Sequence, residues 1–510
     1  MGRIAVAAIV TLWVVPISIL VNRIVPDSYM DEIFHVPQAQ KYCNGNFRSW
    51  DPMITTPPGL YYLSLAHVAS LYPGIVFTRV APSFSPACSI QILRSINGIL
   101  AVLCSVLVYE IISHLRPNLD DKRAMIYAVI LALYPLHWFF TFLYYTDVAS
   151  LTAVLAMYLA CLKKNYWLSA LFGIFAVFIR QTNVIWMLFV ACSGVIDTTL
   201  TFHDDNIQMH ENDVVVEESS SLIAKGSLTS KANLRKRKFS RTKDVGKQVP
   251  QFTRFSSINQ KLGLLDEIRA MILTMWRMRF KLLVSFFPFV IVLIAFVAFV
   301  CWNGSIVLGA KEEHAVSLHF AQIMYFGLFS ALLMAPMHCN LSQVIDLFHS
   351  FWKGRPLSFF LVFIALLAGF ISVQYFSIAH PYLLADNRHY PFYLWRKVIN
   401  AHWSSKYLLI PAYICSWFSI IKILGESQRK IWVVAYFLAT AAVLVPAPLI
   451  EFRYFTTPFY FLMLHSQMNG RLNWSLVALL YIALNAFTMF MFLFRPFYWE
   501  NETGKQRFIW

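Results

Sequence analysis

The sequence predicts an all-α, polytopic membrane protein with roughly 12 to 14 transmembrane helices. Hydrophobic residues make up 58% of the chain and charged residues only 13%, whereas about 25% of a soluble domain is charged. Apolar stretches of nearly bilayer-spanning length recur along the whole chain. This composition excludes a soluble globular protein and indicates membrane lipid as its surroundings.

The apolar stretches divide the chain into two membrane modules around one charged loop. The predicted spans cover 4–21, 90–112, 124–140, 148–162, 168–179, 184–196, 283–302, 320–337, 357–379, 405–423, 431–446, 451–467 and 474–494. We therefore expect an amino-terminal module over 1–196, with its first loop over 22–88, and a carboxyl-terminal module over 282–510. The intervening residues 197–281 predict a charged, largely disordered cytoplasmic loop.

The positive charge is unevenly distributed, and this predicts the orientation of the chain in the membrane. Between residues 225 and 261 there are eleven Lys or Arg and one acid, which is typical of a cytoplasmic segment. The net charge of +16 therefore does not indicate a nucleic-acid partner. Alternation of the spans places the loops that follow residues 21, 140, 179, 302, 379 and 446 on the lumenal side.

The eight cysteines are scattered, without a C-x-x-C pair or a ligand-like spacing with histidine. This pattern argues against a zinc site and against a disulfide scaffold. The chain also has no G-x-x-x-x-G-K-[ST] phosphate loop, so an ATP-driven pump is not expected.

The first predicted lumenal loop carries an unusual group of polar residues close to the membrane. Asp31, Glu32 and His35 lie within one helical turn, and Asp51 follows before two prolines. We expect helices over 31–42 and 58–72, because Pro57 and Pro58 suit the first turn of a helix. Charges at such a depth are costly unless they function or are paired. Taken alone, Asp31 and Glu32 could equally cap a surface helix.

Other predicted lumenal loops contribute further polar groups: Arg180, Gln181 and Asn183; Asp386, Asn387, Arg388, His389 and Tyr390; and Glu451 and Arg453. Each group has a plain structural alternative. Arg388 could pair with Asp386, and Glu451 could pair with Arg453. Arg180, at the end of a span, could extend its charge to the interface.

Five segments together resemble one enzyme family: YMDEIFHVPQAQ, WDPMITTPPGLY, FIRQTNVIW, LADNRHYPFY and EFRYF, in that order. They resemble the endoplasmic-reticulum glucosyltransferases that use dolichyl-phosphate glucose, in particular those that add the terminal α-1,2-linked glucose to the lipid-linked oligosaccharide. The resemblance implies a GT-C glycosyltransferase fold with lumenal interfacial helices. It also implies dolichyl-phosphate glucose as donor and the diglucosylated lipid-linked oligosaccharide as acceptor.

The resemblance also implies roles for individual residues. Asp31 is the acid of the first lumenal loop that matches the catalytic base of related enzymes, with Glu32, His35 and Asp51 in support. We expect Arg388 to bind the donor phosphate, helped by His389 or Arg180. The remaining residues expected to bind substrate are Asn387, Tyr390, Gln181, Asn183, Glu451 and Arg453.

These roles imply a one-step inverting displacement in which a base takes the proton of the acceptor hydroxyl as it attacks C1 of glucose. The leaving group is a phosphate, so it needs positive charge rather than an acid. No D-x-D occurs on the lumenal side, so we expect neither a metal nor another cofactor. Two alternatives stay open: transfer of another dolichyl-phosphate sugar, and a transporter or channel-associated protein.

Overall fold

The computed structural model describes residues 1–71, 87–199, 202, 263–312, 316–338, 356–467, 470–500 and 504–510. Within these residues the regular structure is helical, and β-pairing is limited to two isolated bridges. The protein is thus an all-α polytopic membrane protein, as predicted from its composition. The predicted loop at 197–281 lies mostly outside the described residues, although its last part forms helix α12 (Leu264–Arg277).

Eleven described helical segments are apolar enough to account for membrane spans. Five are long enough to cross a bilayer: α1 (Gly2–Ile24), α5 (Ile90–Leu115), α13 (Arg279–Asn303), the joined α20 and α21 (Ser405–Ser427), and α24 (Arg471–Phe494). Six are shorter: α8 (Thr146–Leu162), α9 (Tyr166–Ile179), Asn183–Thr199, α14 (Ala321–Leu333), α17 (Pro356–Tyr375) and α22 (Lys430–Leu444). These segments correspond to the stretches predicted from hydropathy.

Three predicted spans are interrupted in the structure. The span over 124–140 divides into α6 (Asp121–Ala132) and α7 (Pro135–Phe140), because the proline begins a new helix at its first turn. The span over 320–337 divides into α14 and α15 (Ala335–His338). The span over 451–467 begins with a 3₁₀ turn, Phe452–Phe455, before α23 (Thr456–His465). The last of these breaks matters because Arg453 lies in its 3₁₀ turn.

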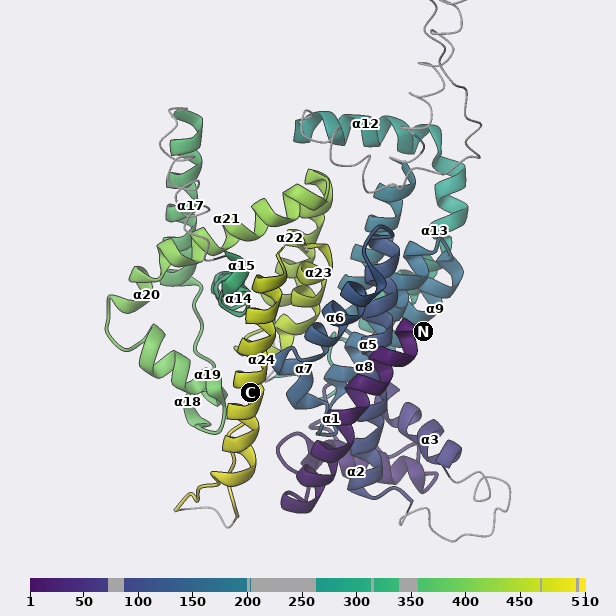
Figure 1. The fold of residues 1–510 in the computed structure, drawn as a ribbon, viewed down its shortest axis with the longest axis vertical. Coiled ribbons are helices and arrows are strands. Elements are labelled where there is room, and N and C mark those ends of the chain that lie inside the picture. Colours follow the sequence, from purple (N-terminus) through teal and green to yellow (C-terminus); the bar gives the residue numbers. More distant parts are fainter. Residues whose placement is uncertain are drawn as a thin grey trace, which may run out of the picture.

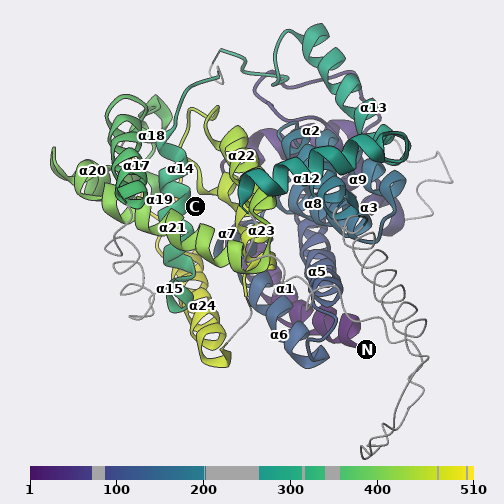
Figure 2. The same ribbon diagram turned by 90° about the horizontal axis from the view of Figure 1, so that it is seen from above.

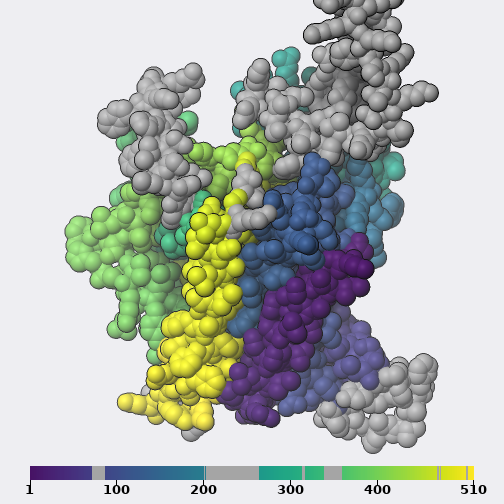
Figure 3. Space-filling model, in the orientation of Figure 1, coloured from purple at the N-terminus to yellow at the C-terminus, as the bar shows by residue number. Residues whose placement is uncertain are grey.

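The helices form one body with distinct ends (Figure 1). Helices α2 (Glu32–Cys43) and α3 (Gly59–Leu71) lie at its lower end, and α12 crosses its upper end. We call these the α2 end and the α12 end. The view from above separates the amino-terminal helices from the group of α17 and α21 (Figure 2). On the face drawn in Figure 3, α24 and α1 lie beside each other.

Helix α23 lies in the centre and joins the two modules through aromatic contacts. The rings of Tyr134 and Phe459 stack with centroids 4.4 Å apart, and Trp186 stacks on Phe461 at 5.3 Å. Nearly all of the α23 side chains are buried. Such close ring packing fixes the position of the turn that precedes α23.

A disulfide between Cys43 and Cys88 joins the end of α2 to the segment before α5. The scattered spacing of the cysteines, which argued against a disulfide scaffold, gave no indication of this single bond. The two residues are 45 positions apart and have no local motif, so only the fold brings them together. Helix α3 in turn packs closely on α9, because a Cβ on Gly59 would lie 2.4 Å from the carbonyl oxygen of Phe178.

The carboxyl-terminal residues 504–510 fold back toward the α2 end. There the short helices α18 (Pro381–Ala385) and α19 (Tyr390–Leu394) flank the segment 386–389. The Ile509 N–H donates to the Arg388 carbonyl at 2.9 Å, and the Tyr390 N–H donates to the Ile509 carbonyl at 3.1 Å. The Tyr29 hydroxyl also donates to the Arg507 carbonyl at 2.6 Å. The tail therefore holds two loops of the α2 end together.

Candidate active site

Asp31 occupies the N-cap position of α2 and points into a cluster of charges. The preceding Met30 has a left-handed backbone, with φ of 57°, which turns the chain sharply into the helix. One carboxylate oxygen, Oδ2, accepts a hydrogen bond from Arg453 Nη1 at 2.8 Å. The Asp31 side chain is 39% exposed, compared with 12% for Arg453. Asp31 is therefore both oriented and accessible.

Arg453 lies in the 3₁₀ turn before α23 and links three carboxylates. Its Nε and Nη2 both donate to Glu451 Oε2, at 3.0 and 2.6 Å. Its Nη1, bonded to Asp31, is also 3.8 Å from Asp147 Oδ2. The guanidinium lies over the rings of Phe140 and Tyr145 at 5.5 and 5.3 Å. Glu451 and Arg453 do pair with each other, as the structural alternative proposed, but Arg453 also bonds Asp31.

Asp147 connects Arg453 to Arg180. It sits in the first turn of α8, 6% exposed, and its Oδ1 accepts from Arg180 Nη1 at 2.7 Å. Its buried Oδ2 has no hydrogen bond to any described residue and faces Arg453. The Arg180 guanidinium also lies 5.8 Å from the centroid of the Tyr454 ring. The sequence alone assigns Asp147 no role.

The charges of this cluster determine which protonation state Asp31 holds. Burial by itself raises the pKa of the Asp31 carboxyl, but attraction to Arg453 and His35 outweighs it, so the pKa is lowered. Burial lowers the pKa of His35, and Asp31 opposes this only in part. Asp31 is accordingly ionised near neutral pH and able to accept a proton.

Glu32, the neighbour of Asp31, points away from this cluster into the protein. Its side chain is fully buried, and its two oxygens accept from Arg94 Nε at 2.8 Å and Nη2 at 2.6 Å. They also accept from the backbone N–H groups of Tyr29 and Tyr144. Arg94 in turn donates to the carbonyls of Val25 and Asp27. Glu32 thus fixes the entry to α2 against α5.

The segment 386–390 forms a second polar group beside the carboxyl-terminal tail. Arg388 makes a bidentate pair with Asp386, with both N–O distances 2.8 Å, and its Nη1 donates to Gln506 Oε1 at 2.9 Å. Its guanidinium lies 4.6 Å from the centroid of the Trp499 ring. Burial by itself raises the pKa of the Asp386 carboxyl, but hydrogen bonding to Arg388 and the charges of His389 and Arg388 together outweigh burial, so the pKa is lowered. The structural alternative considered for Arg388 is therefore present.

The neighbours of Arg388 are also tied to the end of the chain. Asn387 Oδ1 accepts from Trp499 Nε1 at 2.9 Å, and His389 Nδ1 lies 3.1 Å from the Trp510 carbonyl oxygen. The Tyr390 ring packs on Trp510, and its buried hydroxyl has no hydrogen bond to a described residue. His389 is also close enough to Asp31 to lower the pKa of that carboxyl.

The remaining site residues from the sequence have well-defined partners. His35 Nδ1 lies 2.7 Å from the Tyr61 hydroxyl, and Asp51 Oδ1 accepts from the Met53 N–H at 2.9 Å. Gln181 Nε2 donates to the Thr55 carbonyl at 3.1 Å. Asn183 is buried and bonded to Ser150 within the helix bundle. Asn183 therefore packs between helices, whereas His35 faces the Asp31 cluster.

The cluster of Asp31, Asp147, Arg180, Glu451 and Arg453 combines an ionised, accessible base with two arginines. Such a group can accept a proton while cations stabilise developing negative charge nearby. Within the described parts of the chain, no three His, Cys, Asp or Glu side chains are grouped as metal ligands. The expectation that no metal is needed stays a prediction.

Comparison with known proteins identifies the chain by sequence. A family model described as the DIE2/ALG10 family matches residues 25–464. An Arabidopsis thaliana protein named Dol-P-Glc:Glc(2)Man(9)GlcNAc(2)-PP-Dol alpha-1,2-glucosyltransferase is 59% identical, covering 100% of both chains. Proteins of the same name from Mus musculus and Drosophila melanogaster are 36% and 30% identical, covering 96% and 98% of this chain and 94% and 97% of theirs. No solved structure matches. The chain therefore belongs to the DIE2/ALG10 family.

Proposed function

We propose that this protein transfers glucose from dolichyl-phosphate glucose to the diglucosylated lipid-linked oligosaccharide, forming the terminal α-1,2 linkage. The observation that carries the proposal is the full-length, 59% identity to a relative named for this reaction. Because the identity covers both chains completely, the site loops and the helices that hold them are included. The fold proposed for the helical body is the GT-C glycosyltransferase fold.

The proposed location is the endoplasmic-reticulum membrane, with the α2 end in the lumen. The distribution of Lys and Arg supports this orientation, since residues 225–261 carry the concentrated positive charge of a cytoplasmic loop. The Cys43–Cys88 disulfide independently supports it, because disulfides persist in oxidising compartments such as this lumen. Neither observation involves the residues of the charge cluster, so the orientation is argued independently of the proposed catalytic roles.

Asp31 is proposed as the catalytic base. Its oxygen takes the proton of the acceptor 2-hydroxyl while that hydroxyl oxygen attacks C1 of the donor glucose. The bond from C1 to the phosphate oxygen breaks on the opposite face, so the β-linked donor gives an α-linked product. Dolichyl phosphate leaves with the bonding electrons. Among the clustered carboxylates, Asp31 is 39% exposed, Glu451 15% and Asp147 6%, which favours Asp31 for contact with substrate.

Arg453 is proposed to position this base. Its bond to Asp31 keeps the carboxylate ionised and holds Oδ2 in a fixed direction, while Oδ1 stays available to the acceptor hydroxyl. The lowered pKa of Asp31 reduces its intrinsic basicity, so orientation and proximity are the main contributions expected.

The departing phosphate requires positive charge at the edge of the site. Arg388 and His389 are the proposed donor phosphate ligands, with Arg180 assisting from the far side of Asp147. Binding through Arg388 requires the phosphate to share or displace its pairing with Asp386. The aromatic side chains beside it provide an apolar surface for the first part of the dolichyl chain.

The test is glucose transfer by the purified protein. Incubation with dolichyl-phosphate glucose and the diglucosylated acceptor should add one hexose, sensitive to an α-1,2-specific glucosidase. Dolichyl-phosphate mannose in place of the glucose donor should give no product. Transfer of mannose, or no transfer by protein that is folded and lipid-loaded, would overturn the proposal.

A further inference from the structure

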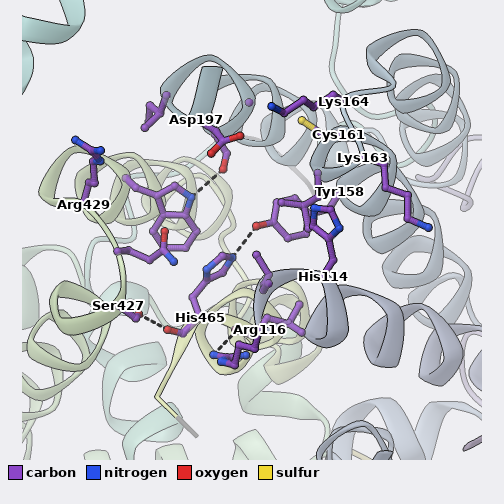
Figure 4. A pocket seen from close by; sticks show the side chains of 18 of the residues that line it. His114, Arg116, Tyr158, Cys161, Lys163, Lys164, Asp197, Ser427, Arg429 and His465 are labelled. Atoms are coloured by element: carbon purple, nitrogen blue, oxygen red, sulfur yellow. Dashed lines mark hydrogen bonds between the residues drawn. The ribbon is translucent and has the colours of Figure 1, made fainter. Parts of the chain in front are cut away.

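A cavity of about 560 Å³ opens among helix ends on the α12 side of the body (Figure 4). Its wall is formed by the ends of α5, α8 and α23, the turn between α8 and α9, residues 193–197, and the turn before α22 with its first residues. The volume falls in the range of about 300 to 1,000 Å³ that is usual for small-ligand sites. We call it the basic cavity.

The basic cavity is separate from the Asp31 cluster. Helix α8 runs between them, with Asp147 in its first turn and Cys161 in its last. Fourteen residues of α-helix span about 21 Å. A ligand in the basic cavity therefore cannot touch the carboxylates proposed for glucose transfer.

The lining is strongly positive. Lys163, Lys164, Arg116 and Arg429 line the cavity, whereas Asp197 is the one carboxylate among its described lining residues. Basic side chains therefore outnumber carboxylates among the described lining residues. Glu110, outside the lining, reaches Lys163 at 3.5 Å but also pairs with Arg3. Lys163, Lys164 and Arg116 are held close together here, and positive groups so close to one another attract an anion.

Arg116 indicates that the positive charge is built into the structure. Its side chain is 9% exposed, and its Nη2 donates to the carbonyls of Leu464 at 2.9 Å and Ser466 at 2.5 Å. Its buried Nη1 has no hydrogen bond to a described residue. Burial lowers the pKa of Arg116 to about 10, so the group stays charged at neutral pH. A buried arginine with an unused donor is costly unless a ligand accepts from it.

Neutral polar and aromatic groups lie beside Arg116 in the lining, because Arg116 bonds the two residues that flank His465. His465 Nε2 lies 2.8 Å from the Tyr158 hydroxyl, and its buried Nδ1 has no hydrogen bond to a described residue. Trp432 packs on the His465 ring with centroids 4.3 Å apart. The cavity thus combines a cationic rim with an apolar, aromatic floor, which suits a ligand that has both a charged and an uncharged part.

We propose that the basic cavity binds an anion that carries a phosphate group, either an anionic phospholipid head group or a soluble phosphate ester. Lys163 and Lys164 at the rim act as point charges, and Arg116 offers directed donors from the wall. In the proposed orientation the basic cavity faces the cytoplasmic leaflet, where anionic lipids attract basic residues. The site does not depend on the glucose-transfer assignment.

The test is binding to the purified full-length protein by titration calorimetry, with three probes. They are dihexanoylphosphatidic acid below its micelle concentration, glycerol 3-phosphate, and dihexanoylphosphatidylcholine. Phosphatidic acid should bind more tightly than phosphatidylcholine. Binding of phosphatidic acid alone identifies a lipid head group, and equal binding of glycerol 3-phosphate identifies a soluble ester. If neither phosphate monoester binds, or phosphatidylcholine binds as well as both, the proposal is wrong.

The variant Lys163→Gln/Lys164→Gln should weaken phosphate binding about tenfold or more, since each lysine contributes on the order of a fivefold factor near an anionic surface. The matched control is Lys122→Gln/Arg123→Gln, which removes two exposed charges from the first turn of α6, outside the lining. It should bind as the wild type does. Arg116→Gln, checked for an unchanged melting temperature, should also lose binding. Equal loss in the control, or no loss in either cavity variant, would contradict the proposal.

Discussion

The Arg453 guanidinium bonds the Asp31 carboxylate at 2.8 Å across a separation of 422 residues. This contact joins the turn before α23 to the first residue of the α2 region. It also brings Glu451 and Asp147 into one charge network with Asp31. The proposed base is therefore held by the carboxyl-terminal module, although it belongs to the amino-terminal one.

Removing Arg453 should change the pH dependence of transfer. Because Arg453 lowers the pKa of Asp31, and because the base must be ionised, the acidic limb of the rate profile should move to higher pH in Arg453→Gln. Arg453→Lys keeps the positive charge and should move that limb less. Its rate should still fall, because a lysine cannot bond Asp31 and Glu451 with the geometry of a guanidinium. The measurement is the initial rate against pH for the three proteins. If the acidic limb of Arg453→Gln does not move, Arg453 does not control the ionisation of Asp31.

Glu32 should be required for stability more than for chemistry. Glu32→Gln leaves Arg94 buried without its counter-charge, which should cost about 3 to 5 kcal/mol of folding free energy. Thermal unfolding in detergent measures the loss. The matched control is Asp51→Asn, since Asp51 is partly exposed and accepts a local backbone bond. A stably folded Glu32→Gln protein without activity would instead assign Glu32 to catalysis.

The pair of Arg388 and Asp386 needs two variants measured side by side. If Arg388 binds the donor phosphate, Arg388→Ala should weaken donor affinity more than Asp386→Asn does, at similar melting temperatures. Arg388→Lys should retain part of the affinity, because it keeps the charge but loses bidentate geometry. If both variants are destabilised equally and donor affinity of the folded fraction is unchanged, the pair is only structural.

The orientation of the chain can be tested by cysteine labelling in sealed microsomes. A membrane-impermeant maleimide should label a cysteine placed within residues 225–261 but not one in place of Asn387. The reagent should reach Asn387→Cys only after the membrane is permeabilised. Labelling of Asn387→Cys in sealed vesicles would reverse the proposed orientation and put the Asp31 cluster on the wrong side for a lumenal acceptor.

The sequence predicts the local features of this protein well. Hydropathy locates α1, α5 and α13, and the two prolines before Gly59 anticipate the start of α3. These features depend on neighbouring residues, so pattern and propensity are sufficient to find them. The polar loops that carry Asp31 and Arg453 are also visible, because charge near apolar segments is unusual.

Long-range partners are where the sequence gives too little information. Cys43 and Cys88 carry no local pairing motif, and Arg94 lies inside a span where nothing indicates that it meets Glu32. The position of the carboxyl-terminal tail beside Arg388 also depends on how α24 packs. Asp147 at the start of α8 is noticeable as an acid before an apolar run, but its role between two arginines appears only in the fold.

The central claim, that Asp31 is the catalytic base, is tested most directly by the initial rate of glucose transfer in Asp31→Asn. Asparagine keeps the size of the side chain and a hydrogen-bonding oxygen for Arg453, but it cannot take the acceptor proton. The rate should fall by about 100-fold or more at unchanged melting temperature, whereas Asp27→Asn, at an exposed carboxylate of the same loop, should remain close to wild type. A folded Asp31→Asn protein that transfers glucose at a near-normal rate would contradict the claim.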